Sequence, residues 1–313
     1  MAQIILLAGL AGFASALLSG MLTPGIVSLA FLFLVAPLPL FITSFGWHAL
    51  AGALAGLLGA ILIDLTTGNR AAMAFATLFA FPAFVIPAAA ERAFAAPDRD
   101  IRRDGIVMGQ LALAMAGYLA MVIVVTSLWI EPDYARFVTR LREFVADGLR
   151  VMSVPGNPAL ADPATFNRVV ELMASIMLPV SGLIIIVTLV MSAAFGAMVA
   201  ERSGRLSYGK PGFNGFRLPG GSLILFGAAL LVTMWDGYMG VFAEILALGL
   251  GFLLMLQGLA VLHMRLAGQN GRGLLLTAAW GSILIFGLPA LLFVGVGFAD
   301  HLLDLRNRER AGR

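Results

Sequence analysis

The 313-residue chain lacks cysteine altogether and has little charge or histidine. The absence of cysteine excludes disulfide bonds, thiolate metal sites, iron–sulfur clusters and cysteine nucleophiles. Three histidines are too few for a histidine-rich metal site, so we expect neither a metal nor another cofactor. The net charge of +3 is too small to favour nucleic acid as a partner, and it indicates instead an excess of arginine in cytoplasmic loops.

Apolar residues dominate what is present. Hydrophobic residues make up 60% of the chain and charged residues 12%, whereas soluble domains have about 45–50% and about 25%. With a mean hydropathy of +0.97, the interior alone cannot hide the apolar side chains, so most of the outer surface must face hydrocarbon. The sequence therefore predicts an all-α, multi-pass inner-membrane protein, with residues 1–313 as a single membrane domain in the lipid bilayer.

Nine apolar segments have roughly the length that a helix needs to cross a bilayer. They cover residues 4–22, 26–43, 47–65, 71–90, 106–130, 170–200, 222–235, 240–263 and 274–298. The seventh segment is marginal, because its residues span only ~21 Å as a helix, against a hydrocarbon core of ~30 Å. We therefore expect a transmembrane helical bundle of eight or nine helices.

The positions of arginine predict the topology. Residues 91–104 and 201–218 form loops rich in basic side chains, which favours the cytoplasmic side for both. Residues 131–168, between them, then form an extracytoplasmic insertion. Nine crossings would also put the arginine-rich C-terminal tail outside, so we favour a cytoplasmic tail and a short seventh segment that does not cross.

The insertion has a helical pattern of its own. Over residues 132–152, apolar side chains recur every three or four positions, and charged side chains fill the opposite stripe. The apolar stripe consists of Phe137, Leu141, Phe144, Val145, Leu149 and Met152. This pattern predicts an amphipathic helix, which would act as a lid, as a docking surface or as a helix lying in the membrane interface. A second helix is predicted to begin at Asp162, followed by Pro163, and to run to about residue 200.

Polar residues inside apolar segments are the candidate ligand-binding residues, because charge in hydrocarbon is costly. Glu244 lies a few residues inside its segment, near Asp236, Trp235 and Tyr238. These four residues predict an acidic, aromatic-rimmed mouth for a cationic or polar ligand; the alternative is an ordinary turn at the interface, with its acids in water.

Two further residues complete the candidate set. Asp64 ends its segment and would contact ligand, cap the helix or form a surface ion pair. Gln257 would either contact ligand or hydrogen-bond between helices. No paired carboxylates, no nucleophile beside a base and no metal-ligand spacing occur among the candidates, so we expect no enzyme.

Four short motifs carry a resemblance to a known family. They are Pro37-Leu38-Pro39-Leu40, Leu178-Pro179, Gln257-Gly258-Leu259, and Gly297-Phe298-Ala299-Asp300 followed by Asp304, Arg306 and Arg308. Their order resembles the YybS-like predicted membrane proteins of bacteria, a family of unknown function. The glycine-rich stretch from Gly46 to Asp64 is similar to the substrate-binding components of energy-coupling-factor vitamin transporters. The resemblance implies a helical core that binds a small molecule or serves as an envelope scaffold, and it carries over no catalytic residue.

The sequence thus predicts a transporter-like or small-molecule-binding membrane component, with a small molecule or another membrane protein as its partner. The alternative is a non-enzymatic envelope scaffold or partner-docking protein. In the tail, Asp304 and Arg308 lie one helical turn apart, which predicts an ion pair between them, and the tail arginines would meet anionic lipid.

Overall fold

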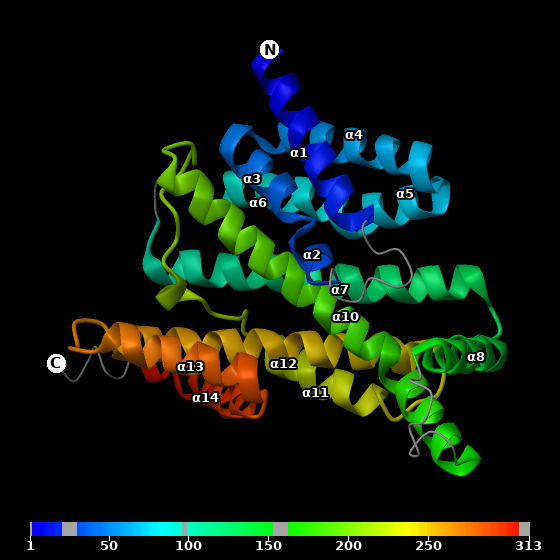
Figure 1. The fold of residues 1–313 in the computed structure, drawn as a ribbon. Helices are drawn as coiled ribbons and strands as arrows, with labels where there is room; N and C mark the ends of the chain where they lie inside the picture. The colour runs from blue at the N-terminus through cyan, green and yellow to red at the C-terminus, as the bar shows by residue number, and fades with distance from the viewer. Residues whose placement is uncertain (1, 21–29, 96–98, 153–161, 307–313) are drawn as a thin grey trace.

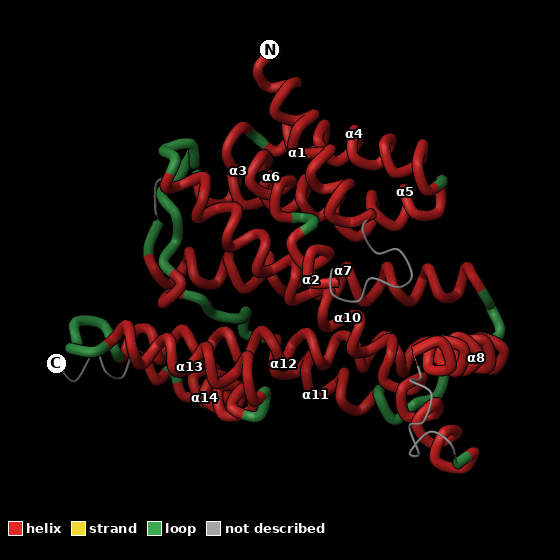
Figure 2. Tube along the Cα trace, viewed as in Figure 1, coloured by secondary structure: helices red, strands yellow, loops and turns green. Residues whose placement is uncertain are grey.

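The computed structural model describes residues 2–20, 30–95, 99–152 and 162–306. Every regular element in these ranges is a helix (Figure 2), which confirms the predicted helical class. The helices are α1 Ala2–Gly20, α2 Ala30–Val35, α3 Leu38–Trp47, α4 Ala49–Thr67, α5 Asn69–Phe75, η2 Ala76–Ala80, α6 Phe81–Phe94, α7 Ile101–Ile130, α8 Tyr134–Met152, α10 Pro163–Arg202, η3 Phe213–Gly215, α11 Ser222–Val232, α12 Tyr238–Arg265, α13 Arg272–Phe286 and α14 Pro289–Leu303.

The helices form two groups joined by a pair of long helices (Figure 1). In one group α1, α3 and α6 pack on α4, and in the other α11 and α14 pack on α12. Helices α7 and α10 lie between the groups, and α10 contacts both α3 and α12. The most deeply buried helix is α12, where Leu250, Leu253 and Leu259 have no exposed surface, so it forms the centre of the second group.

Five helical stretches are long and apolar enough to cross a membrane. They are Ala49–Thr67, Asn69–Phe94, Ile101–Ile130, Pro163–Arg202 and Tyr238–Arg265. Five more apolar helices are shorter: Gln3–Ser19, Leu32–Trp47, Ser222–Val232, Arg272–Phe286 and Pro289–Leu303. The helical membrane bundle is therefore present in the described chain, whereas the predicted count of eight or nine full crossings is not confirmed.

The predicted span over residues 274–298 is in fact two helices. Gly287, at φ 69°, reverses the chain between α13 and α14, because glycine has no Cβ to clash at a positive φ. This extra reversal returns the tail to the loop between α10 and α11, where Nη1 of Arg217 lies 2.6 Å from Oδ1 of Asp304. The predicted partner of Asp304, Arg308, lies outside the described residues.

The amphipathic helix and its successor are observed as predicted. Helix α8 lies across the end of α7, and Figure 1 shows it nearly end-on. The carboxylate of Asp162 accepts a hydrogen bond of 2.9 Å from the backbone N–H of Thr165 and so caps α10. A small core of Val145, Val170 and Ala174 joins α8 to the first turns of α10.

Candidate ligand-binding site

The predicted acidic mouth is at the turn between α11 and α12. Trp235 is 65% exposed and Asp236 is exposed, whereas Glu244 is half-buried on α12. Both acidic residues are close enough to Tyr134 for their charges to raise the pKa of its hydroxyl, although burial is the larger cause. The structure thus brings the two acids to one region, and neither acid lines either of the two cavities described below.

Tyr238 faces the protein rather than a ligand space. Its hydroxyl donates a hydrogen bond to the backbone carbonyl of Glu131, and its ring contacts those of Tyr134 and Phe137 at centroid distances of 5.2 and 5.6 Å. Tyr238 therefore joins the start of α12 to the start of α8.

Asp64 and Gln257 lie far from this turn. Asp64 is exposed at the end of α4, where its backbone carbonyl accepts from Gly68. Gln257 is buried on α12: its Oε1 accepts from the N–H of Leu218 at 2.9 Å, and its Nε2 donates to Oδ2 of Asp300 at 2.8 Å. This is the interhelical hydrogen-bonding role that the sequence offered as the alternative to ligand contact.

A large cavity lies elsewhere, between α6, α7, α10, α12 and the loop over residues 203–221. We call it the chamber; its volume is about 450 Å³. Its wall is almost entirely apolar and rich in methionine and aromatic side chains. The methionines are Met108, Met115, Met191 and Met198, and the aromatic residues are Phe45, Phe94, Phe195, Tyr208, Phe213, Phe216 and Trp280. Such flexible and aromatic side chains adapt to apolar ligands of different shape.

The chamber has an exposed wall on one side and an ion pair at its loop end. Ala194 and Phe195 of α10 line it and are also exposed, Phe195 by 46%, so it opens laterally along α10. At the loop end it is bordered by an ion pair, with Nζ of Lys210 3.1 Å from Oε2 of Glu201. Lys210 is the one lysine of the sequence.

Arg99 fixes the loop at this end. Its Nη2 donates to the carbonyl oxygen of Gly209 at 2.6 Å and to Oδ2 of Asp104 at 2.7 Å, and the guanidinium lies 5.2 Å from the ring centroid of Phe94. Charge-assisted hydrogen bonds of this kind are among the strongest in proteins. The segment before α7 therefore holds the loop over the chamber.

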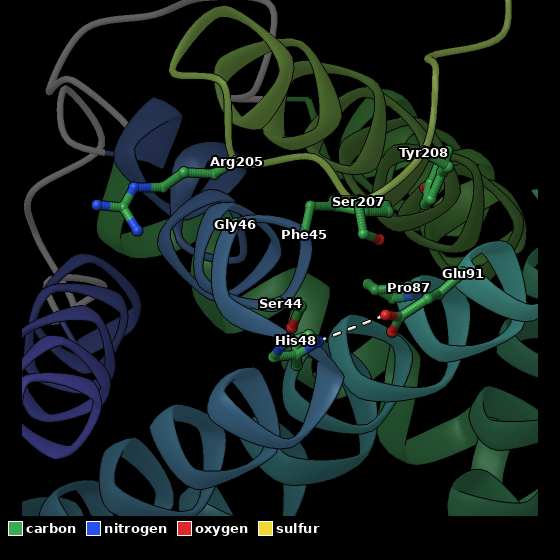
Figure 3. Close-up of a pocket in the computed structure, with 9 residues that line it drawn as sticks. All are labelled: Ser44, Phe45, Gly46, His48, Pro87, Glu91, Arg205, Ser207 and Tyr208. Carbon is green, nitrogen blue, oxygen red and sulfur yellow. Dashed lines mark hydrogen bonds and ion pairs between the residues drawn. The ribbon is translucent and has the colours of Figure 1, made fainter. Parts of the chain in front are cut away.

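A second, small cavity adjoins the chamber (Figure 3). We call it the recess; its volume is about 50 Å³. It is lined by Ser44, Phe45, Gly46, His48, Pro87, Glu91, Arg205, Ser207 and Tyr208. Phe45 and Tyr208 also line the chamber, so these two aromatic side chains separate the cavities. Within the recess, Nδ1 of His48 lies 3.4 Å from Oε1 of Glu91.

The C-terminal residues Asp300 and Arg306 hold the loop over residues 203–221 from the side opposite Arg99. Arg306 and Asp300 form a buried ion pair, 3% and 0% exposed, with Nη2 2.7 Å from Oδ2 and Nε donating to Oδ1 at 3.2 Å. Arg306 also donates to the carbonyl oxygens of Asn214 and Phe216 at 2.9 and 3.0 Å. With Gln257 and Leu218, these residues form what we call the clasp, which holds the segment that brings Phe213 and Phe216 to the chamber.

Reasoning from the sequence missed the chamber and the recess, and of the clasp it identified only the hydrogen-bonding role of Gln257. Most of the chamber residues are ordinary apolar residues of helices, and nothing in the spacing of these residues separates them from lipid-facing positions. The sequence held a signal for the clasp alone. Asp300 and Arg306 lie at the end of an apolar segment, where charged side chains are costly unless they are paired.

No three histidine, aspartate or glutamate side chains among the described residues are grouped so that they could hold a metal ion. Comparison with known proteins gives one family: the model described as "Predicted membrane protein (DUF2232)" matches residues 13–301. No curated protein and no solved structure matches the chain.

Proposed function

The chain belongs to the DUF2232 family of predicted membrane proteins, and we propose that it binds a small, largely apolar molecule within the membrane, as a component of a transport system. The observation that carries the proposal is the chamber. Its volume of about 450 Å³ falls within the range of roughly 300–1,000 Å³ typical of ligand pockets. Its lateral opening along α10 gives an apolar molecule a route from the hydrocarbon without passage through water.

The basic loops support an orientation in the bacterial inner membrane. Arg99, Arg205 and Lys210 lie at the end of the bundle where the chamber meets its loop. By the positive-inside rule this end is cytoplasmic. A ligand entering from the bilayer would therefore reach its polar contacts at the cytoplasmic surface.

The proposal is also one of the two roles that the motif resemblance to YybS-like proteins and to vitamin-binding transporter components would imply, a helical core that binds a small molecule or serves as an envelope scaffold. A catalytic role finds no support, because the chamber wall lacks paired carboxylates and a nucleophile beside a base. We therefore propose that the protein binds its ligand without catalysing a reaction of it.

Filling the chamber tests the proposal. Ala194 lines it and is exposed, so the larger side chain of Ala194→Trp should occupy part of the chamber without disturbing the core. Native mass spectrometry of protein purified in nanodiscs should detect a copurified apolar molecule in the wild type and at least tenfold less in Ala194→Trp. The matched control is Ile184→Trp, on the same helix, 45% exposed and outside the cavity walls. Equal ligand in all three proteins would contradict the proposal.

One observation favours the second candidate, an envelope scaffold. Helix α8 and the first turns of α10 share a small core of their own and carry exposed apolar side chains, with Phe144 66% and Leu172 61% exposed. Crosslinking through a photoreactive residue at position 144 should capture a specific membrane protein if this surface docks a partner. Crosslinks to lipid alone would leave α8 as an interfacial helix.

A further inference from the structure

The chamber and the recess are built by the same elements. Helix α6 presents Ile86 and Ala90 to the chamber and Pro87 and Glu91 to the recess. Helix α3 and the loop over residues 203–221 also line both. A ligand with an apolar body and a small polar end therefore fits this pair of cavities, with the body in the chamber and the polar end beyond the two dividing aromatic rings.

The charged and polar side chains of the recess determine which kind of polar end a ligand can place there. The carboxylate of Glu91 and the hydroxyl of Ser207 point into it (Figure 3). Arg205 points away, with its guanidinium 4.4 Å from the ring centroid of Trp47. Burial raises the pKa of the Tyr208 hydroxyl, and the charge of Glu91 raises it further, so Tyr208 stays neutral. The cationic group that remains is His48, which is charged only when protonated.

The size of the recess and its aromatic side chains further limit which polar group it can bind. A cavity needs roughly 10–15 Å³ to hold one water molecule. The recess, at about 50 Å³, therefore has room for a group of a few heavy atoms. The rings of Phe45 and Tyr208 border this space, and aromatic faces attract cations. An anionic group would meet the carboxylate of Glu91, and juxtaposed like charges are a common means of rejecting a ligand.

We propose that the recess binds the ammonium group of an amphiphilic amine whose apolar body occupies the chamber. This inference rests on the proposed function and adds the ligand class. Glu91 supplies the ionic partner, Ser207 accepts a hydrogen bond, and Phe45 and Tyr208 separate the charged end from the apolar body.

Three eight-carbon probes test the ligand class. Octylammonium, octanoate and octanol are titrated by calorimetry into the full-length protein in nanodiscs, with empty nanodiscs as the blank. Octylammonium should bind at least tenfold more tightly than octanoate, and octanol should lie between them. Equal or tighter binding of octanoate, or no binding of octylammonium, overturns the proposal.

Two substitutions in the recess test its location. Glu91→Gln should weaken octylammonium at least fivefold, and Ser207→Leu, at an exposed position, should do the same by filling the recess. The matched control is Glu171→Gln, which removes the carboxylate that pairs with Arg142, on an exposed part of α10 that lines neither the chamber nor the recess. It should leave the affinity within twofold of wild type, and unchanged unfolding temperatures establish that the variants are folded.

The outcomes separate this inference from the proposed function. If Ala194→Trp abolishes octylammonium binding while Glu91→Gln and Ser207→Leu do not weaken it, the chamber is supported as the binding site and the proposal for the recess is wrong. If Lys210→Gln rather than Glu91→Gln changes the affinities, the head group lies at the Lys210–Glu201 pair and the recess proposal also falls. If Ala194→Trp has no effect on any probe, the chamber itself is not the binding site.

Discussion

Arg306 stands out among the residues because its charged guanidinium is almost completely buried and yet fully paired. Its guanidinium bonds Asp300 and two loop carbonyls, so removing it leaves the carboxylate of Asp300 buried without its ionic partner. Losing one member of such a pair costs about 3–5 kcal/mol, far more than losing an exposed ion pair.

We predict that Arg306→Ala lowers the free energy of unfolding by about 3–5 kcal/mol, seen as a large fall in the thermal unfolding temperature in detergent. Arg272→Ala, at an exposed position at the start of α13, should change it by no more than about 0.5 kcal/mol. Similar unfolding temperatures for the two variants would show that the clasp is not a major source of stability.

Tyr238 shows how the setting of a residue decides its role. Its hydroxyl bonds the carbonyl of Glu131, so Tyr238→Phe leaves that buried acceptor without its partner. We predict a loss of about 1–3 kcal/mol in unfolding free energy and an unchanged octylammonium affinity. A selective loss of affinity with no loss of stability would instead support the acidic mouth that the sequence predicted.

Among the elements, α12 and α14 approach each other through glycine. A Cβ on Gly258 would overlap the carbonyl oxygen of Phe293, and one on Gly297 would overlap that of Leu254. The same holds in the first group, where Gly56 packs on Ala80 and Gly12 on Ala55, as expected for helices that associate through small residues.

We predict that Gly258→Ala destabilises the protein by about 1–3 kcal/mol, because α14 must shift to admit the methyl group. Gly251→Ala is the matched control on the same helix, where a Cβ would meet no atom within 4 Å. It should be neutral or slightly stabilising, since alanine favours helix more than glycine does. Equal effects in thermal unfolding would mean that α12 and α14 are not in close contact.

In the whole molecule, the tail and two loops gather at one end of the bundle. Arg99 bonds the carbonyl of Gly209, and Arg217 pairs with Asp304, so segments from three parts of the chain meet there. The turns between α4 and α5 and between α7 and α8 lie at the opposite end (Figure 1).

The absence of native cysteine makes this topology directly testable. Single cysteines at Ser203 and Asn270 should react with a membrane-impermeant maleimide only after cells are permeabilised, and cysteines at Asn69 and Asp133 should react in intact cells. All four positions are exposed. Labelling of Ser203 and Asn270 from opposite sides would contradict the arrangement of α11 to α13.

The features that depend on composition and short-range spacing were predictable from the sequence. The apolar content required a membrane, the three-to-four-residue period gave α8, and Asp162 followed by Pro163 marked the start of α10, because a bilayer, a helix face and a helix cap each act on neighbouring residues.

The chamber, the recess and the clasp depend on how separate helices pack. The recess joins Ser44, Glu91 and Ser207, and the clasp joins Asn214, Gln257 and Arg306, which are distant in sequence and have no shared local pattern. The turn at Gly287 likewise decided the side of the tail, since one positive φ reverses a segment whose apolar composition reads as a single span. Cavities and buried ion pairs arise from the packing of separate helices, and that packing is not encoded in the periodicity of any one of them.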